Sequence, residues 1–216
     1  MAPQTEKALE LIDAAHAEDP NKTASGKPYE LHYAKRMTHY LSVHSPDASS
    51  LLRIAVRAQH FRRWEVPRDS YPKTKVGYFA WRTFLKKRQA EQVKQICLDC
   101  DFSEADASKV AALIAKEELK KGEGKGDADA QVLEDCACLV FLDDQFDHYE
   151  TKWKVEHDSE EKADNKMISI LQKTWVKMGK RGQEMALQLD LSNKAKELVG
   201  KALTQQPSPT AQENIA

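Results

Sequence analysis

Apolar residues recur every three to four positions along almost the whole chain, and no stretch alternates regularly between apolar and polar residues. This spacing is typical of amphipathic helices, because successive residues turn by about 100° around a helix. We therefore expect an all-α fold: a single helical domain over residues 1–204, a bundle with a polar central pocket, and a disordered tail over residues 205–216. The expected helices cover residues 5–17, 29–43, 47–64, 77–100, 103–120, 130–149 and 167–178, with short helices from Arg181 and Ser192.

Three acidic residues interrupt the apolar faces of these helices. Glu30 shares a face with Met37 and Leu41, and Glu117 and Asp135 have similar positions in the helices at 103–120 and 130–149. A carboxylate removed from water costs several kcal/mol unless a cation or hydrogen-bond donors meet it. In one interpretation the three acids therefore form internal ion pairs that fix helix packing. The arginines available for such pairs are Arg36, Arg57, Arg63 and Arg82.

In the other interpretation the acids surround a divalent metal together with a histidine. Carboxylate and imidazole groups suit manganese, iron, magnesium or zinc. His60 is the preferred histidine, and His16 is not, because it stands at the end of its helix. The expected metal ligands are Glu30, His60 and Asp135, with Glu117 and His60 as catalytic groups. Such a metal would polarise a substrate oxygen or activate bound water.

Basic residues are concentrated between positions 50 and 90. This stretch contains eleven lysines and arginines and only two acids, Glu65 and Asp69, although the whole chain has a formal net charge of −1. The helix at 47–64 is expected to present arginines, His60 and Trp64 on one face, and arginine forks bind carboxylate or phosphate through two hydrogen bonds. The residues expected to bind a small anionic substrate are Arg57, Arg62, Arg63, Trp64, Arg68, Arg82 and Gln89.

Cysteine spacing and hydropathy limit the remaining possibilities. Cys97 and Cys100, with Cys136 and Cys138, would formally allow a zinc site, but cysteines at apolar helical positions are more often reduced and structural. No apolar run approaches the roughly 20 residues needed to cross a bilayer. The N-terminus lacks the pattern of a secretory signal. We expect a cytoplasmic protein with no membrane partner, and its oligomeric state stays open.

Four segments resemble an uncharacterised family of fungal and bacterial proteins that often carries a transferred label of glutamyl-tRNA synthetase. These segments are ELHYAKRM, RAQHFRRWEVPRDSYP, YFAWRTFLKKR and LEDCACLVFL, and the resemblance covers roughly residues 7–200. The chain has no phosphate-binding glycine loop, no HIGH-like or KMSKS-like signature and no alternating strands. We therefore do not expect an aminoacyl-tRNA synthetase.

More distantly, the chain is similar to the HD superfamily of helical metal-dependent phosphohydrolases. That resemblance implies an HD-like bundle in which His60 is the histidine of the His-Asp pair, Asp135 is the final aspartate and Glu30 is the early ligand. Phe61 stands where the aspartate of the pair should be. Bidentate metal binding by such a pair is therefore unavailable here.

Three functional hypotheses follow. The first is a metal-dependent enzyme acting on a small anionic substrate, with a phosphate ester as the favoured class and an oxygenase as a variant. The second is a non-catalytic RNA-binding or adaptor protein that uses the basic segment 53–88, where Tyr71, Tyr78 and Trp81 alternate with cations. The third is a structural protein in which the inward acids are only ion-paired.

Overall fold

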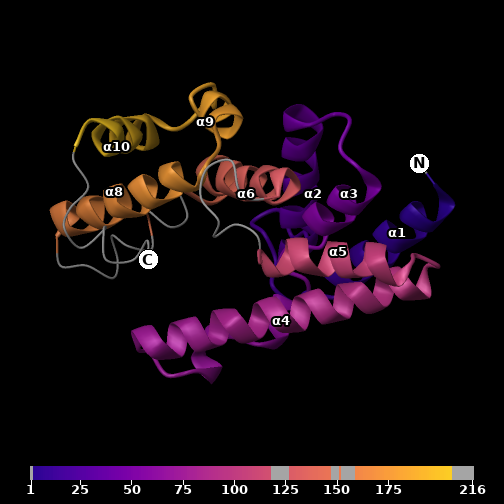
Figure 1. Cartoon of the computed structure of the whole chain (residues 1–216). Helices are drawn as coiled ribbons and strands as arrows, with labels where there is room; N and C mark the ends of the chain where they lie inside the picture. The colour runs from indigo at the N-terminus through magenta and orange to yellow at the C-terminus, as the bar shows by residue number, and fades with distance from the viewer. Residues whose placement is uncertain (1, 118–126, 147–150, 152–158, 206–216) are drawn as a thin grey trace. The chain divides into compact units, whose positions relative to one another are not determined.

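The computed structural model describes residues 2–117, 127–146, 151 and 159–205 (Figure 1). Every regular element in these residues is helical, and a single bridge between Lys22 and Pro28 is the one strand-like pairing among them. The all-α prediction is confirmed. The chain divides into two compact units, Met1–Leu133 and Glu134–Ala216, and each is described by itself. The predicted tail covers residues 205–216, of which 206–216 lie outside the described residues.

The first unit is built on five helices. Their bounds are α1 Pro3–Ala17, α2 Tyr29–His44, α3 Ser50–Arg57, α4 Lys75–Asp99 and α5 Glu104–Ala115. In Figure 1, α5 lies along the C-terminal part of the long helix α4, and α1 packs against α2, α3 and α4. Ile12, Met37, Leu41, Ile54 and Val93 are completely buried in this unit. The apolar stripes recognised in the sequence are therefore the contact faces of these helices.

Side-chain caps fix where three of these helices begin. Ser49, Thr74 and Ser103 accept hydrogen bonds from the backbone N–H groups of Leu52, Gly77 and Asp106. Each bond satisfies an amide that has no partner inside its own helix. The predicted starts of α4 and α5 are close to these caps, because caps are local sequence features.

Two helices end earlier than predicted. Helix α5 stops at Ala115, since Lys116 is left-handed with φ of 56°, and Glu117 beyond it is exposed. The prediction that Glu117 points inward from a helix is therefore wrong. Helix α3 stops at Arg57 rather than near Trp64, and residues 58–62 form turns. Two short 3-10 segments follow, η1 at Arg63–Glu65 and η2 at Arg68–Ser70.

Among its described residues, the second unit contains the rest of α6 (Ala128–Val140), a π-helical segment η4 (Phe141–Gln145) and further helices after residue 158. These are α8 Glu160–Lys177, α9 Lys180–Ala186 and α10 Asn193–Thr204. Helix α10 packs along α8 (Figure 1), and Leu139, Met167 and Leu198 are completely buried. Among the residues that the structure describes in either unit, no helix is both long and apolar enough to cross a membrane.

Candidate functional site

Glu30 lies at the start of α2 and is almost completely buried, as its sequence position predicts. Its Oε1 accepts a hydrogen bond from the backbone N–H of Trp64 at 3.1 Å, and its Oε2 lies 3.2 Å from Nδ1 of His16. Its own backbone N–H donates to Oδ2 of Asp19 at 2.9 Å. Both carboxylate oxygens therefore already have partners within the first unit.

His16 connects this carboxylate to α3. The imidazole is completely buried, and its Nε2 lies 3.0 Å from the backbone oxygen of Arg57. A carbonyl oxygen only accepts, so Nε2 carries a hydrogen. The contact between Nδ1 and Glu30 Oε2 therefore links α3, through His16, to the start of α2.

His60 does not lie on a helix face. It occupies the turn after α3 with φ of 65°, and its ring stacks on Tyr33 at a centroid distance of 4.2 Å. Nη1 of Arg63 donates to Nε2 of His60 at 3.0 Å, so Nε2 is an acceptor and the hydrogen of the neutral ring lies on Nδ1. Burial, followed by the positive charge of Arg63, lowers the pKa of His60 well below its ordinary value of 6.5. His60 is therefore neutral at pH 7, and its acceptor nitrogen is already in use.

Asp135 belongs to the second unit and is also buried, as predicted. Its Oδ1 accepts a hydrogen bond from the backbone N–H of Gly179 at 2.8 Å, at the N-terminal end of α9. A Cβ atom on Gly182 would lie only 2.5 Å from the carboxyl carbon of Asp135, so glycine at this position permits the close approach of α9. Asp135 thus stabilises the start of a helix, where a negative charge is favoured.

The predicted metal-binding set is not assembled by this geometry. Among the described residues, no group of three or more histidines, cysteines, aspartates or glutamates is placed to hold a metal ion. Glu30 and His60 are engaged by protein groups in the first unit, Asp135 by α9 in the second, and Glu117 is exposed. Among the described residues this geometry offers no metal-binding cluster, so we derive no catalytic step through a divalent metal, and the metal ligands stay a prediction.

The four cysteines are buried thiols without disulfides. Burial raises the pKa of Cys97 and of Cys136 to about 12, which leaves both thiols protonated and unreactive at neutral pH. This state agrees with the structural role that their apolar positions indicate. The alternative of a zinc site finds no ligand cluster among the described residues.

Three arginines near the α3–α4 connection are neutralised by carboxylates. Arg57 makes two hydrogen bonds to Asp13, both of 2.6 Å. Arg62 binds Glu18 and Glu65, and Arg88 also binds Glu65. Although partial burial of Glu65 by itself raises its pKa, the hydrogen bonds from both arginines outweigh that effect and lower it. We call residues 57–65 the arginine turn, and two of its predicted substrate ligands, Arg57 and Arg62, hold acids of the same chain.

Three further arginines meet aromatic rings instead. The guanidinium carbon of Arg63 lies 4.8 Å from the centroid of Trp81, and those of Arg68 and Arg82 lie 5.8 and 5.7 Å from the centroid of Tyr78. Arg68 also donates to the backbone oxygens of Tyr71 and Pro72. Within the described part of the chain, no carboxylate pairs with these three arginines. They therefore retain an uncompensated positive charge.

The start of α4 carries this charge beside exposed aromatic groups. Residues 70–90 contain six cations, five aromatic residues and no acid. Tyr78 and Phe79 are 40% and 50% exposed, and the exposed Arg82 lies on the same side of α4, four and three residues further along. Trp81 is buried, with its indole N–H donating to the backbone oxygen of Val66 at 2.9 Å. We call the following group the basic aromatic surface: Arg68, Tyr78, Phe79, Trp81 and Arg82.

The loop that precedes α4 holds this surface in shape. A Cβ atom on Gly77 would lie 2.3 Å from the backbone oxygen of Pro72, so only glycine lets the loop fold back on the first turn of α4. The two hydrogen bonds from Arg68 fix the same loop from its other side. The surface is therefore ordered before any ligand arrives, which lowers the entropic cost of binding.

Two predicted substrate ligands have a different environment. Gln89 is buried as predicted, whereas Arg82, seven residues earlier on the same side of α4, is exposed. Buried atoms without a hydrogen-bond partner among the described residues include Nε2 of Gln89 and Nε1 of Trp64. Neither residue belongs to the basic aromatic surface.

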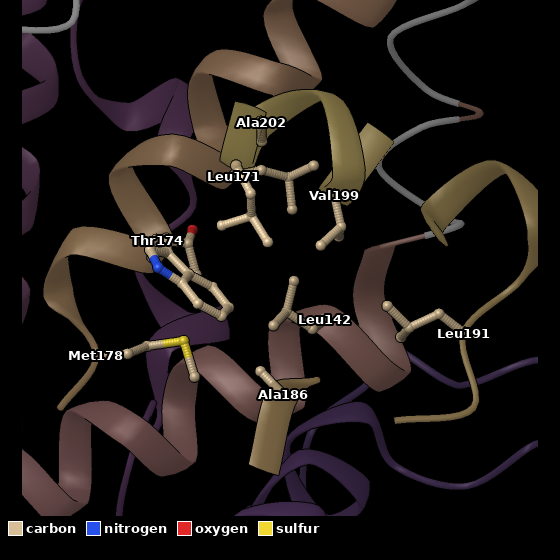
Figure 2. Close-up of a pocket in the computed structure, with 10 residues that line it drawn as sticks. Leu142, Leu171, Thr174, Met178, Ala186, Leu191, Val199 and Ala202 are labelled. Atoms are coloured by element: carbon tan, nitrogen blue, oxygen red, sulfur yellow. The ribbon is translucent and has the colours of Figure 1, made fainter. Parts of the chain in front are cut away.

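The pocket in Figure 2 lies in the second unit and is apolar. It holds about 340 Å³ of space, including its open mouth, and Leu142, Leu171 and Val199 point into it. The remaining lining side chains include Trp175 and Met178, and none of the predicted site residues is among them. The polar central pocket expected from the sequence is therefore a different feature, and it stays a prediction.

The hydrogen-bond partners of Glu30 were not predicted from the sequence. His16 was expected at an exposed helix end, but it is completely buried, and Asp19 is almost so. A signal was present for His16, because it follows Ile12 by four residues on the face that also buries Ala8. The partnership of Glu65 with Arg62 and Arg88 could not be recognised, since it requires the α3–α4 connection to fold back on α4.

Comparisons with known proteins identify the family of the chain. The sequence profile of a family described as "Domain of unknown function (DUF4202)" matches residues 6–199. No curated protein and no solved structure matches the chain. The family match supports the resemblance to an uncharacterised family and assigns no activity.

Proposed function

The chain belongs to the family described as Domain of unknown function (DUF4202), and we propose that it is a non-catalytic protein that binds single-stranded RNA on its basic aromatic surface. The observation that carries the proposal is the acid-free segment 70–90, in which exposed Tyr78 and Phe79 lie on the same side of α4 as Arg82. Proteins that bind single strands combine cations for the phosphates with rings on which bases stack.

The distribution of charge supports this function over a purely structural one. A structural arginine usually forms an ion pair with an acid, as Arg57 of the arginine turn does with Asp13. Arg82 of the basic aromatic surface, and Arg63 of the arginine turn next to it, contact rings, which leaves their charge available to a phosphate. A base stacked on Phe79 or Tyr78 would keep its phosphate within reach of such side chains. The chain has a net charge of −1, so the attraction is local rather than global.

Fluorescence anisotropy with a labelled oligouridine tests the proposal. We expect Phe79→Ala to weaken binding by about 1–3 kcal/mol, the usual value of one base stacked on an aromatic ring. Arg82→Ala should reduce the slope of log affinity against log salt by about 0.7, the value for one phosphate contact on a single strand. Lys35→Ala, an exposed cation on α2, is the control and should change neither quantity.

Three outcomes would overturn this function. The first is no binding of RNA at low salt. The second is that Phe79→Ala and Arg82→Ala bind RNA as tightly as the control Lys35→Ala. The third is equal competition by polyglutamate, which carries charge but no bases and would indicate an acidic peptide as the partner.

The metal-dependent phosphohydrolase or oxygenase stays a prediction, together with the HD-like ancestry and the cytoplasmic location. Metal content of protein purified without an affinity tag separates it from the RNA-binding proposal. A stoichiometric metal that is lost in Asp135→Ala would favour the enzyme. Protein that binds RNA without such a metal would favour the basic aromatic surface.

A further inference from the structure

We infer that the buried pair His16 and Glu30 acts as a clamp that positions Arg63 for RNA binding, an inference that rests on the proposed function. The pair holds both ends of the arginine turn. His16 donates from Nε2 to the backbone oxygen of Arg57, and Glu30 accepts from the backbone N–H of Trp64. Because His16 and Glu30 also contact each other, the two ends are joined by one continuous set of hydrogen bonds.

The turn between these ends needs such support. His60 and Arg62 have φ values of 65° and 48°, in the left-handed region that side chains other than glycine rarely adopt. A non-glycine residue in this conformation is strained, and it persists when surrounding contacts enforce it. Phe61, between the two, is buried with its ring 5.6 Å from that of His16 in an edge-to-face contact. His16 thus supports both the backbone and the central side chain of the turn.

The arginine turn also contacts the basic aromatic surface. Arg63 directs Nη1 to His60 within the turn and places its guanidinium over Trp81, whose indole N–H binds Val66 just beyond the turn. The backbone oxygen of Arg62 accepts from Arg88 of α4, although at a long 3.4 Å. A shift of the turn would therefore move Arg63 relative to the rings of α4. Glu30 and His16 touch no ligand themselves and are positioning residues.

Two uncharged replacements of Glu30 separate the clamp from other roles. Glu30→Gln keeps the size of the side chain, an oxygen that accepts from Trp64 and an amide that donates to Nδ1 of His16. Glu30→Met has a similar size and removes both hydrogen bonds, which leaves His16 and the backbone N–H of Trp64 without these partners. The two variants share the loss of charge and differ in hydrogen bonding.

The expected result is that Glu30→Gln binds oligouridine like the unchanged protein, whereas Glu30→Met weakens binding as much as Arg63→Ala does. The double variant of Glu30→Met and Arg63→Ala should bind no more weakly than either single one, because both changes remove the same contact. A purely structural role for Glu30 predicts additive losses instead. Equal affinity of Glu30→Met and the unchanged protein would also overturn the inference.

Hydrogen exchange provides a test that does not depend on folding of Glu30→Met. The amide of Trp64 should exchange slowly in the unchanged protein and equally slowly in Glu30→Gln. Fast exchange of this amide in the unchanged protein would refute the clamp. Failure of the clamp is distinct from failure of the proposed function: if Phe79→Ala weakens RNA binding and Glu30→Met does not, only the clamp is wrong.

Discussion

The arginine turn and the basic aromatic surface are adjacent in the chain and rich in the same residue type, yet their arginines have different partners. In the turn, Arg57 and Arg62 bind acids from α1 and from the turn itself. On the surface, Arg68 and Arg82 meet rings and backbone oxygens. An arginine already paired with a carboxylate fixes the fold, and one that has no acidic partner among the described residues remains available to an anionic ligand. The density of basic residues alone does not separate the two roles.

Arg57→Ala is expected to have the largest effect, and this effect is on the stability of the protein. The change removes two short hydrogen bonds to Asp13 and a third to Thr38 at 2.9 Å, in a side chain that is only 15% exposed. We expect the free energy of unfolding, measured by urea denaturation, to fall by about 2–3 kcal/mol, since charge-assisted hydrogen bonds contribute that order of energy. RNA affinity of the folded variant should be unchanged. A loss of affinity with intact stability would reverse the roles assigned to the two regions.

Gly77→Ala should affect both stability and binding. Its new methyl group would clash with the backbone oxygen of Pro72, and overpacking of this kind costs about 1–3 kcal/mol. Gly200→Ala is a matched control, because a Cβ atom there meets nothing within 4 Å in the middle of α10. We expect the control to stabilise the protein by about 0.5–1 kcal/mol. Thermal unfolding and oligouridine binding are measured on both variants. Equal stability and equal RNA affinity of the two variants would show that the loop at Pro72 does not shape the surface.

His60 makes the stability of the arginine turn depend on pH. Its pKa in the folded protein lies well below 6.5, so the unfolded chain binds the proton more readily as the pH falls below that value. Stability should therefore be fully present above about pH 6.5 and decrease toward lower pH, by at most about 1.4 kcal/mol per pH unit for one proton. His60→Asn, which tolerates a left-handed conformation and does not titrate, should remove this part of the slope. An identical slope in both proteins would contradict the assignment.

The smallest effect is expected for Arg68→Lys, which keeps the charge and loses the fork. Lysine cannot donate to the oxygens of Tyr71 and Pro72 together as Arg68 does at 2.9 and 2.8 Å. We expect a loss of about 1 kcal/mol in unfolding free energy, typical of a lost hydrogen bond. The salt dependence of RNA binding should be unchanged, because the number of cations is the same. A changed salt slope with unchanged stability would indicate that the fork of Arg68 contacts RNA directly.

The extent of prediction from sequence differs between the helices and the site. The all-α fold, the approximate starts of α4 and α5 and the burial of Glu30 and Asp135 follow from periodicity and local preferences. The end of α3 does not, because the segment after Arg57 is compatible with a continued helix. Side chains of α1 and α2 bind the backbone of the turn in place of helical partners. The predicted face that joined His60 and Trp64 to α3 was wrong for that reason.

The sequence by itself determined that this protein is helical, where its apolar faces lie, and that an acid-free basic and aromatic segment occupies residues 70–90. Those properties depend on spacing and composition along a single chain. Only the tertiary structure decided that Glu30 binds His16 and the Trp64 amide, and which arginines already hold an acid. The partners of a buried charge come from segments distant in sequence, because only packing brings them within hydrogen-bond distance.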